Sequence, residues 1–497
     1  MRTVDPTHTT AYTKTIIDNE RQVRMRKLKR LCVIGILPLA LLWVLLPLRA
    51  VDDSPGGQLY RQHCATCHGA DLQGGMAQSL VNGVWQFGQG RNYIHSNIKF
   101  GLPHLGMPGY DETLTDQQIR QLVDFILDAQ GQAQVSRPPI PKETYSLDYT
   151  ITVEKWVEGL EMPWSIQFLD ASTALVTERP GRLRVVKNGT LNTEPIQNTP
   201  AVLDEGQGGL LDVAIDPNYA DNGWIYLSYS HALPASAGQR PNAMTRIARG
   251  RIKNHTWTDQ QVLYEAPHET YLPTRHHYGC RIVFDKKGYL CFGIGDRGIQ
   301  DQAQDLQRPN GKIHRIRPDG TLPTDNPFID HDDALPTIYA LGVRNPQGLA
   351  ICPQTDRLWA TDHGPLGGDE INLIQAGGNY GWPVITYGRN YNGSLITEFV
   401  EKPGMQQPIL YYTPSIAICS MDFYTGRLFA KWQNRLLITA LRYEEVRLLD
   451  VKENRILHDQ VILKNAGRVR DITVGPDGAL YVVLNLPHTI LRLTPKP

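Results

Sequence analysis

The spacing of apolar residues divides this chain of 497 residues into three parts. Residues 31–48 form a mostly apolar run without a charged side chain. Between residues 115 and 126 apolar side chains recur at the spacing of one helix face, and beyond residue 149 they alternate with polar ones in short segments broken by Gly, Pro and Asp. These patterns predict a membrane-spanning helix, a small all-α domain and an all-β domain.

The first apolar run is long enough to cross a membrane. As a helix its eighteen residues extend about 27 Å, close to the hydrocarbon thickness of a bilayer. By the positive-inside rule, the six basic residues directly before it keep residues 1–30 in the cytoplasm: Arg21, Arg24, Arg26, Lys27, Lys29 and Arg30. We therefore expect a single-pass anchor at residues 31–49 in the inner membrane, with the rest of the chain in the periplasm.

A cleaved signal peptide is the alternative interpretation of this segment. Against it, about thirty residues precede the apolar run, which is long for the charged region of a signal peptide. Leu48 also stands where a small residue is needed for cleavage after Ala50. Export of the following domains is expected in either case.

The all-β part contains a repeated unit. Two apolar strands around a turn rich in Asp, Pro or Gly occur six times, and the units begin at Ser165, Leu211, Arg281, Gln347, Ile416 and Asp471. Repetition of both spacing and chemistry favours a propeller over a sandwich. We expect a six-bladed β-propeller over residues 147–497, with residues 149–156 closing the ring against the C-terminal strand.

The small all-α domain carries a haem-attachment motif. Cys64 and Cys67 can form thioethers to one haem, and His68 then lies beneath the iron. Thr115 begins a capping box with Gln118, followed by apolar residues at helical spacing. These features predict an all-α cytochrome c domain with haem c at residues 52–130.

The sixth ligand of the haem iron is expected to be Met107. It lies in a Met-Pro loop, and a thioether ligand raises the potential of a haem. Met76 and His95 are the alternative ligands.

Residues 131–146 are rich in Gln and Pro, including Pro138, Pro139 and Pro141, and lack apolar periodicity. This composition predicts a semi-stiff linker between the two exported domains.

Cys280 and Cys291 flank a predicted hairpin that turns at residues 285–288. Pairing Phe284 with Tyr289 would place Cys291 opposite Ile282 and leave Cys280 only diagonal to it. Buried thiols are therefore expected, and a disulfide is the alternative.

Charge and loop chemistry narrow the function. Lys+Arg and Asp+Glu are both 50, so no net positive charge favours nucleic-acid binding. The propeller loops hold the chemistry-bearing residues His277, Arg344 with Asn345, a Gly-rich segment from Gly364 to Glu370, and Arg468 with Arg470. Each could be structural alone, but together they describe a pocket with a base, several cations and carbonyls that can bind Ca²⁺. Such a pocket suits a polyanionic cofactor.

Six strings in this part resemble a known family. They are EGQGGLLD from Glu205, HYGCR from His277, GVRNPQG from Gly342, HGPLGGDEIN from His363, GGNYGWP from Gly377 and RVRD from Arg468. In order and spacing, residues from about 145 to 497 resemble the soluble glucose dehydrogenases and aldose sugar dehydrogenases that use pyrroloquinoline quinone (PQQ), the glucose/sorbosone dehydrogenase family.

The resemblance implies roles for individual residues. His277 would take the proton of the anomeric hydroxyl while hydride passes to the quinone, Arg344 would stabilise charge on the reduced quinone, and Gln207 would face the sugar. The remaining expected contacts are Ca²⁺ ligands from the carbonyls of Gly364 and Pro365, and cofactor contacts from Asn345, Arg468 and Arg470.

Two positions depart from the family pattern. Arg442 stands where the family commonly has Lys, so the positive charge is kept in a different geometry. Cys280 stands where relatives often carry Gly, beside the expected base. These two positions leave the identity of the sugar open.

The combined expectation is a membrane-anchored quinoprotein that oxidises aldoses to lactones. Electrons would pass to its own haem c and then to a respiratory carrier or oxidase. The alternatives are a dehydrogenase for sorbosone or another aldehyde, and a non-catalytic propeller that binds a sugar or a protein beside an electron-transfer cytochrome.

Overall fold

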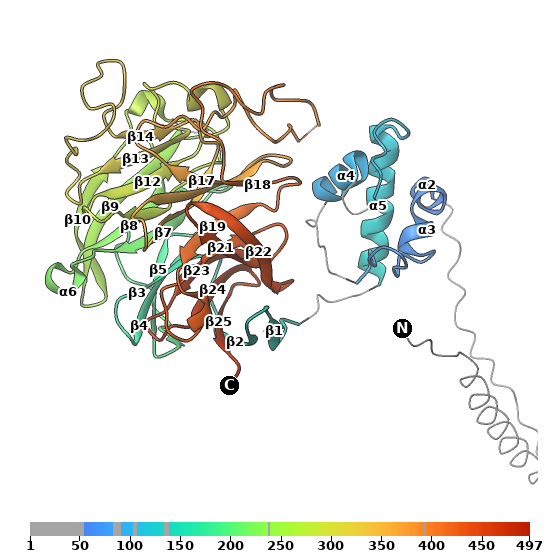
Figure 1. The fold of residues 1–497 in the computed structure, drawn as a ribbon, viewed down its shortest axis with the longest axis horizontal. Helices are drawn as coiled ribbons and strands as arrows, with labels where there is room; N and C mark the ends of the chain where they lie inside the picture. Colours follow the sequence, from blue (N-terminus) through green and yellow to red (C-terminus); the bar gives the residue numbers. More distant parts are fainter. Residues whose placement is uncertain (1–53, 83–90, 103–106, 134–138, 237–238, 392) are drawn as a thin grey trace, which may run out of the picture. The chain divides into compact units, whose positions relative to one another are not determined.

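The computed structural model describes residues 54–82, 91–102, 107–133, 139–236, 239–391 and 393–497. Within these ranges a small helical domain precedes six antiparallel sheets, as Figure 1 shows. The predicted cytoplasmic segment 1–30 and the predicted anchor 31–49 lie outside the described residues. Over the ranges above, no helix is both long and apolar enough to cross a membrane.

The helical domain is built from α2 (Pro55–His63), α3 (Ala65–His68), α4 (Arg91–Phe100) and α5 (Asp116–Gln132). The predicted capping box begins α5: Thr115 Oγ1 accepts from the Gln118 N–H at 3.3 Å, and Gln118 Oε1 accepts from the Thr115 N–H at 2.9 Å. Its expected apolar face is buried, at Ile119, Leu122, Val123 and Ile126.

Helix α2 crosses α5 closely at Gly56. A Cβ at this position would come within 2.2 Å of the Gln121 carbonyl oxygen, so no larger residue fits. The crossing brings Tyr60 of α2 against Phe125 of α5, with ring centroids 5.4 Å apart. The helix that directly precedes the haem motif is thereby fixed to the closing helix.

The all-β part is a six-bladed propeller, as predicted. The first three sheets contain β3 (Pro163–Phe168), β4 (Thr173–Glu178), β5 (Arg182–Lys187) and β6 (Thr190–Leu191); β7 (Leu210–Ile215), β8 (Ile225–Ala232), β9 (Ala243–Lys253) and β10 (Thr256–Tyr264); and β11 (Ile282–Phe284), β12 (Leu290–Ile294), β13 (Lys312–Ile316) and β14 (Ile338–Leu341).

The fourth to sixth sheets contain β15 (Pro346–Ile351), β16 (Leu358–Asp362), β17 (Asp369–Ile374) and β18 (Leu410–Tyr412); β19 (Ile418–Phe423), β20 (Leu436–Ala440), β21 (Glu445–Lys452) and β22 (Arg455–Lys464); and β23 (Arg468–Val474), β24 (Leu480–Leu486) and β25 (Thr489–Pro495) with β2 (Thr150–Val157) and β1 (Glu143–Tyr145). Short helical turns lie at α6 (Tyr219–Asn222), η2 (His268–Thr270), η3 (Gln300–Ala303) and η4 (Ala430–Trp432).

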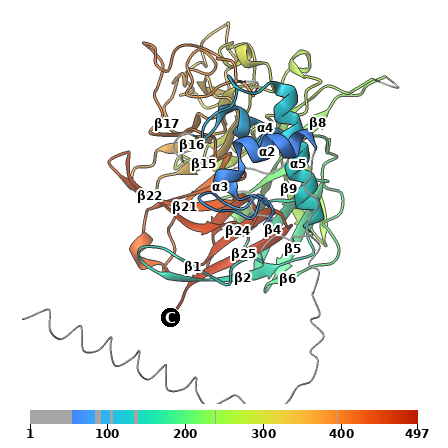
Figure 2. The same cartoon turned by 90° about the vertical axis from the view of Figure 1, so that its right-hand side faces the viewer.

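The ring closes where the sequence predicts. Strand β2 pairs antiparallel with β25, with Ile151 opposite Pro495 and Val153 opposite Leu493. Figure 2 shows β1, β2, β25 and β24 side by side in this closing sheet. The first strand of the domain and the last are thus held in one sheet, so the ring closes by backbone hydrogen bonds.

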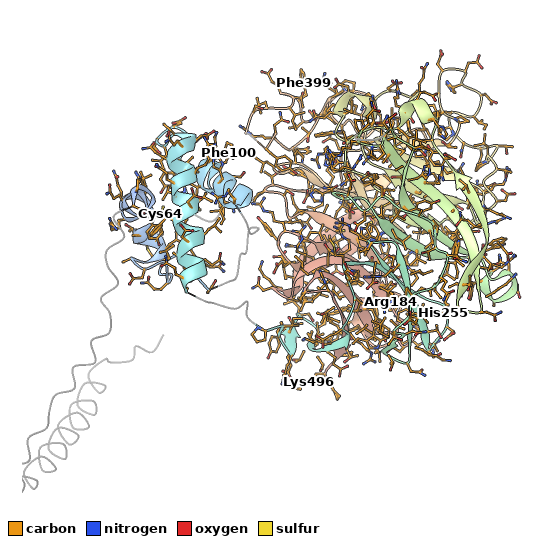
Figure 3. The ribbon with its side chains drawn as sticks, turned by 180° about the vertical axis from the view of Figure 1, so that it is seen from behind. Cys64, Phe100, Arg184, His255, Phe399 and Lys496 are labelled. Carbon is orange, nitrogen blue, oxygen red and sulfur yellow. The ribbon has the colours of Figure 1, made fainter. Side chains whose placement is uncertain are left out.

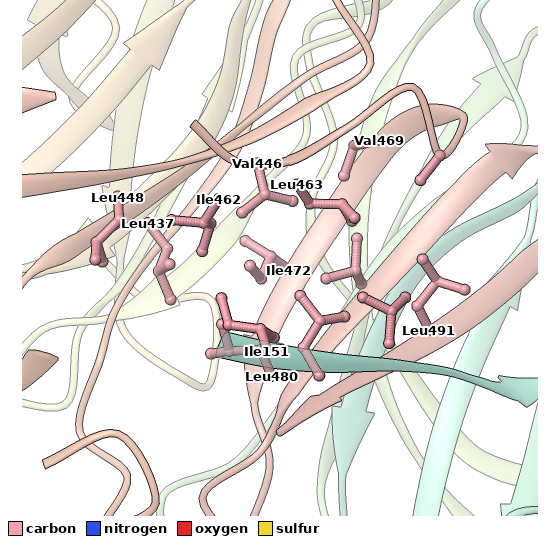
Figure 4. Close-up of a cluster of buried hydrophobic side chains, with 14 of the residues drawn as sticks. Ile151, Leu437, Val446, Leu448, Ile462, Leu463, Val469, Ile472, Leu480 and Leu491 are labelled. Atoms are coloured by element: carbon pink, nitrogen blue, oxygen red, sulfur yellow. The ribbon is translucent and has the colours of Figure 1, made fainter. Parts of the chain in front are cut away.

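Apolar side chains fill the spaces between neighbouring sheets. The largest cluster joins the fifth and sixth sheets, where Ile151, Leu437, Val446, Leu480 and Leu491 are fully buried (Figure 4). Burial of such side chains contributes about 1.5–3 kcal/mol each to the free energy of unfolding.

Buried aspartates of three sheets bond the first strand of the following sheet. Asp212 Oδ2 accepts from the Ile282 N–H at 2.7 Å, Asp369 Oδ2 from the Ile418 N–H at 2.9 Å, and Asp471 Oδ2 from the Ile166 N–H at 3.0 Å. In each case the carboxylate belongs to one blade and the N–H to the next. The aspartates therefore connect neighbouring blades by hydrogen bonds to backbone groups that would otherwise be unpaired.

Arg281 connects two of these aspartates. Its Nη1 lies 2.8 Å from Asp212 Oδ1 and 3.0 Å from Asp471 Oδ1. The guanidinium is also 4.5 Å from the centre of the Trp164 ring. One buried cation thus contacts residues of the first, second and sixth blades.

The structure corrects the predicted hairpin register. Phe284 pairs with Leu290 and Ile282 with Phe292, so the prediction that Phe284 pairs with Tyr289 was wrong by one residue. The turn includes one more residue because the Asp285 N–H donates to the Tyr289 carbonyl. Cys280 and Cys291 are buried thiols, and none of the six cysteines in the described ranges forms a disulfide.

The predicted linker 131–146 is shorter at both ends. Helix α5 continues to Gln132, and β1 already begins at Glu143. The sequence pattern missed β1 because three residues of an edge strand carry no clear alternation.

Candidate active site

His277 lies in the segment that leads into β11. Its backbone φ of 56° is in the left-handed region, which residues other than glycine rarely occupy. Its N–H donates to Gln207 Oε1 at 2.8 Å, and its Nδ1 lies 2.6 Å from Asp296 Oδ1. A strained residue that two partners hold in place is typical of a functional position.

The His277 imidazole is neutral at pH 7. Burial, followed by the positive charge of Arg344, lowers its pKa to about 4. Burial alone would raise the pKa of Asp296, but the hydrogen bonds from His277 and Gly298 and the nearby charges of His277 and Arg344 together outweigh it, so the pKa lies below its ordinary value. The neutral ring therefore donates its Nδ1 proton to an ionised carboxylate, and its Nε2 carries a lone pair that can accept a proton.

Asp296 is a candidate functional residue that the sequence analysis missed. It is 1% exposed, and its Oδ2 accepts from Trp382 Nε1 at 2.8 Å while Oδ1 also accepts from the Gly298 N–H at 2.7 Å. The only sequence signal is a carboxylate directly after a buried strand, β12, in a Gly-Asp-Arg-Gly segment that is also typical of an ordinary turn.

Gln207 contacts the backbone of the candidate base. Its side chain accepts the N–H of His277, and its own N–H donates to the Arg275 carbonyl at 2.8 Å. Its side chain is therefore within hydrogen-bond reach of the segment that holds the candidate base, on the exposed side of the site.

Arg344 lies near the candidate base and bonds a carbonyl-rich loop. Its Nη1 donates to the His363 carbonyl at 2.6 Å and to the Gly364 carbonyl at 3.1 Å. Its guanidinium lies 5.5 Å from the centre of the Trp382 ring, and Trp382 in turn binds Asp296. The predicted cation is therefore part of the same contact network as the predicted base.

Two buried aspartates shape the backbone around Arg344. Asp362 accepts the N–H groups of Arg344 at 2.7 Å and Asn345 at 2.6 Å, and Asp369 accepts the Gly364 N–H at 2.8 Å. Asp369 thus has a structural role, as its buried position and contact with the next blade indicate. Only glycine fits at position 364, because a Cβ there would come within 2.4 Å of the Gly367 carbonyl oxygen.

The loop offers oxygen ligands rather than side-chain ligands. Across the described part of the chain, no three His, Cys, Asp or Glu side chains gather as a metal site. A cation at this loop would therefore depend on backbone carbonyls, among them the predicted pair from Gly364 and Pro365. Such a donor set fits a hard cation such as Ca²⁺, and the Arg344 guanidinium already uses the Gly364 oxygen as an acceptor.

Gln347 joins two of the predicted cofactor contacts. Its Oε1 accepts from Arg470 Nη1 at 2.8 Å, and its Nε2 lies 3.2 Å from Asn345 Oδ1. Arg470 Nε is buried and has no hydrogen-bond partner among the described residues. An unpaired buried guanidinium N–H is costly, so an anionic ligand that accepts from it would be stabilised.

The pKa of His363 records how closely the predicted residues gather. Burial first, then the charges of Arg344, His277, Arg470 and Arg468, hold this pKa well below its ordinary value. Four predicted residues from three separate segments of the sequence therefore lie near one imidazole, which is the convergence that the sequence analysis expected.

Arg442 and Cys280 are placed as follows. Arg442 is buried in the turn between β20 and β21, which corresponds to the turns that carry Asp296 and Gly364 in their sheets. Cys280 is buried with a backbone φ of 96°, a conformation that favours glycine, and burial raises the pKa of its thiol. Its backbone explains why a glycine would be tolerated at this position.

The helical domain holds a second histidine by one ring nitrogen. His68 Nδ1 lies 2.8 Å from the Gln78 carbonyl oxygen, which leaves Nε2 as the nitrogen for iron. Cys64 is half-buried and Cys67 is exposed, one on each side of the start of α3. This arrangement fits covalent attachment of a haem.

Met107 is better placed than the alternative iron ligands. It packs, with Cys64, against the apolar core of the helical domain, whereas Met76 is 79% exposed. His95 Nε2 lies 3.8 Å from an Asp116 oxygen at the start of α5. Met107 thus shares an apolar surface with the haem-attachment residue, as a buried haem requires.

Comparison with known proteins agrees with this geometry. The family described as Glucose / Sorbosone dehydrogenase matches residues 160–492, and the family described as Cytochrome C oxidase, cbb3-type, subunit III matches residues 52–126. The chain is 39% identical over 354 residues to the aldose sugar dehydrogenase YliI of Escherichia coli, covering 70% of this chain and 94% of that protein.

Two further similarities cover the propeller. The quinoprotein glucose dehydrogenase B of Acinetobacter calcoaceticus is 26% identical over 408 residues, covering 66% of this chain and 84% of that protein. The crystal structure of the soluble aldose sugar dehydrogenase of Escherichia coli in its apo form superimposes with a TM-score of 0.66 at 37% identity, covering 70% of this chain and all of that one. With its fold and site residues in place, this chain belongs to the glucose/sorbosone dehydrogenase family and carries a cytochrome c domain before the propeller.

Proposed function

We propose that the propeller oxidises aldose sugars at the anomeric carbon to lactones with PQQ and Ca²⁺, and that the electrons pass to haem c on the same chain. The hydrogen-bonded pair of His277 and Asp296 beside Arg344 is the observation that carries this proposal. The names of the similar proteins, an aldose sugar dehydrogenase and a quinoprotein glucose dehydrogenase, support the sugar and the quinone.

His277 is the proposed general base. Its Nε2 accepts the proton of the anomeric hydroxyl, and the ring becomes an imidazolium. The Asp296 carboxylate, 2.6 Å from Nδ1, stabilises that positive charge and holds the ring in one orientation. Proton transfer to a positioned side chain contributes about 10²–10⁴-fold to a rate.

Arg344 supplies the positive charge for the reaction. PQQ, when bound, supplies the acceptor for the hydride that leaves the anomeric carbon. Arg344 is 5% exposed and fixed by the His363 and Gly364 carbonyls, so its charge is present before the reaction begins. Gln207 orients the base segment and faces the sugar.

The cofactor is proposed to lie among residues from several blades. Arg468 and Arg470 pair with its carboxylates, and the unpartnered Nε of Arg470 within the described residues supports an anionic neighbour. Asn345 and Arg442 complete the contacts. The carbonyls of Gly364 and Pro365 hold Ca²⁺, which supplies a Lewis acid when bound.

The haem is proposed to receive the electrons. Cys64 and Cys67 attach it, and His68 and Met107 are the proposed iron ligands. The hydrogen bond from His68 Nδ1 to the Gln78 carbonyl keeps Nε2 directed to the metal. A respiratory carrier or oxidase is the proposed next acceptor.

We also propose that residues 31–49 anchor the chain in the inner membrane and that both domains lie in the periplasm. The basic residues before the apolar run support this orientation. Covalent haem attachment is consistent with export.

The test is reconstitution of the haem-loaded protein with PQQ and Ca²⁺, followed by a panel of aldoses and sorbosone while the haem absorbance is recorded. We expect aldoses to reduce the haem. If only sorbosone reduces the haem, the chain is a sorbosone dehydrogenase, the second activity that the family description names. Absence of both PQQ binding and haem reduction would identify a non-catalytic propeller.

A matched pair of variants tests the base. His277→Ala should abolish sugar-dependent haem reduction while PQQ remains bound. His276→Ala is the control, because its ring lies only 4.8 Å from that of His277 but has no contact with Asp296 among the described hydrogen bonds. Equal loss in both variants would contradict the assignment of His277.

A further inference from the structure

An exposed apolar patch borders the loop that carries Gly364 and Pro365. We define the rim patch as Tyr391, Leu395, Phe399, Val400 and Tyr411, which are 57%, 54%, 50%, 45% and 45% exposed. They are five of the thirteen exposed large hydrophobic residues in the described ranges, and all lie within 21 positions between β17 and the end of β18. Figure 3 marks Phe399 at the outer edge of the propeller. A concentration of exposed apolar residues in one segment is typical of an interaction surface.

Contacts within the connection between β17 and β18 hold the patch residues. The Thr386 N–H donates to the Phe399 carbonyl at 3.1 Å, and Thr397 Oγ1 donates to the Val384 carbonyl at 2.9 Å. Tyr411 stacks on Tyr387 with ring centroids 3.7 Å apart. The apolar side chains are therefore presented by an ordered segment, which lowers the entropy lost on binding.

The same segment lies directly on the carbonyl-rich loop. Leu366 and Arg389 exchange two backbone hydrogen bonds, at 3.1 and 3.3 Å. Gly388 packs on Pro365 so closely that a Cβ there would meet the Pro365 ring at 2.9 Å. A domain bound to the rim patch would consequently stand beside the proposed cofactor site.

The linker can bring the cytochrome domain to this surface. Ten residues separate the end of α5 at Gln132 from the start of β1 at Glu143, and an extended chain of that length spans about 35 Å. Along the outer strands, Leu147 after β1 bonds Gln460 of β22 at 3.0 Å, and Asp459 of β22 bonds Tyr412 of β18 at 3.0 Å. The linker therefore joins the propeller near β22. Strand β22 in turn bonds β18, the strand that contains Tyr411 of the rim patch.

The cytochrome domain exposes one large apolar side chain beside its haem motif. Met76 is 79% exposed, and its neighbour Ala77 donates its N–H to the Cys67 carbonyl at 2.9 Å. Cys67 itself is exposed. The exposed thioether side chain thus lies beside the residue that would attach the haem.

We propose that the rim patch is the docking surface for the cytochrome c domain of the same chain, which binds it with the edge around Met76 and Cys67. The inference rests on the proposed function for its purpose, because docking there shortens the electron path from the sugar site to the haem. A tethered domain is present at about millimolar effective concentration, so a modest apolar interface suffices.

The test measures docking on the haem-loaded full chain without PQQ. A protease site is placed in the linker, and hydrogen–deuterium exchange of residues 387–411 is compared before cleavage and after cleavage with separation of the cytochrome. We expect exchange in this segment to be slower in the intact chain. Phe399→Asp and Val400→Asp should each remove most of that difference, because an aspartate in an apolar interface must be desolvated.

The matched control is Val262→Asp. Val262 and Val400 are both valines and both 45% exposed, but Val262 lies on β10 in the second blade. The control should keep the full exchange difference. Equal exchange before and after cleavage of the wild-type chain would overturn the proposal, as would an equal effect of Val262→Asp and Val400→Asp.

Light scattering tests whether the rim patch binds a second copy of the chain instead of the cytochrome domain. If wild-type protein is dimeric and Val400→Asp is monomeric while exchange is unchanged by linker cleavage, the patch binds another copy and the proposal is wrong.

With PQQ and Ca²⁺ added, Phe399→Asp should slow haem reduction at least tenfold and leave reduction of a small dye by the sugar unchanged. If no sugar reduces haem or dye, the proposed function fails, but the exchange experiment still decides whether the cytochrome docks.

Discussion

The two domains each hold one histidine by its Nδ1, but with different acceptors. In the propeller, His277 donates to the Asp296 carboxylate at 2.6 Å. In the helical domain, His68 donates to the Gln78 carbonyl at 2.8 Å. Both contacts fix the tautomer and direct Nε2 outward. Only the carboxylate can also balance a full positive charge on the ring, which a base acquires and an iron ligand does not.

The comparison teaches that the acceptor bonded to Nδ1 distinguishes a proposed base from a proposed iron ligand. A backbone carbonyl is available at any position of the chain and costs no charged side chain. A buried carboxylate must itself be satisfied, and Asp296 is satisfied by Trp382 and Gly298. The additional contacts around Asp296 are those needed beside a ring that changes its charge during turnover, as we propose for His277.

The largest expected effect comes from removing the carboxylate. Asp296→Ala should lower sugar-dependent kcat about 10²–10⁴-fold, because the imidazolium loses its counter-charge and its orientation. Asp296→Asn keeps an acceptor for His277 and Gly298 and should lose less. Stopped-flow absorbance measures the rate. An unchanged haem spectrum in both variants would confine the effect to the propeller.

The converse change is Met107→Ala in the helical domain. Loss of the thioether ligand should lower the haem potential and slow electron uptake by the haem, while sugar oxidation with a small dye acceptor continues. Redox titration measures the potential. A normal potential in this variant together with a lowered one in His95→Ala would transfer the role of sixth ligand to His95.

The pH dependence of sugar oxidation tests whether the His277 ring is neutral before the reaction. The pKa of His277 is lowered to about 4, so the base is deprotonated and active above that pH and becomes protonated and inactive below it. With dye as acceptor, kcat/KM should be flat from neutral pH down to about 5 and then fall up to tenfold per pH unit. Asp296→Asn should move this fall to lower pH, because the carboxylate raises the pKa of His277. An inflection near pH 6.5 would contradict a buried neutral base.

The smallest expected effect is from Trp382→Phe. The variant keeps an aromatic ring near Arg344 but removes the N–H that donates to Asp296 Oδ2. Loss of one hydrogen bond to a carboxylate costs about 1.5–3 kcal/mol, which corresponds to a rate decrease of about 10- to 150-fold if the carboxylate tilts fully away and less if water replaces the indole. Steady-state kinetics distinguishes this result from a loss of sugar affinity, which would raise KM and leave kcat unchanged.

Much of the fold could be predicted because the pattern repeats. Six pairs of apolar strands with acidic turns predict six blades, and a capping box with apolar residues at helical spacing predicts α5. The hairpin register could not be predicted. One additional turn residue shifts every pair of opposite residues by one position. The residues around Asp285 do not indicate whether Tyr289 belongs to the turn or to the strand.

The candidate site could be predicted where residues form recognisable strings. His277, Arg344 and Arg470 lie in such strings, and the structure brings them near His363. Asp296 could not be assigned, because its partner Trp382 is 86 positions away and only the fold brings them together. Gln347 has the same difficulty, since its contact with Arg470 crosses 123 positions.

The aspartates that join successive blades limit how this propeller can change size. Asp212, Asp369 and Asp471 each accept an N–H from the following blade. Deleting the first, third or fifth blade would remove the N–H that one of these buried carboxylates accepts, and inserting a blade at one of these three junctions would separate an existing pair. A change in blade number during evolution would therefore require coordinated changes at the ring axis, whereas loops on the outer strands can lengthen without disturbing any of these pairs.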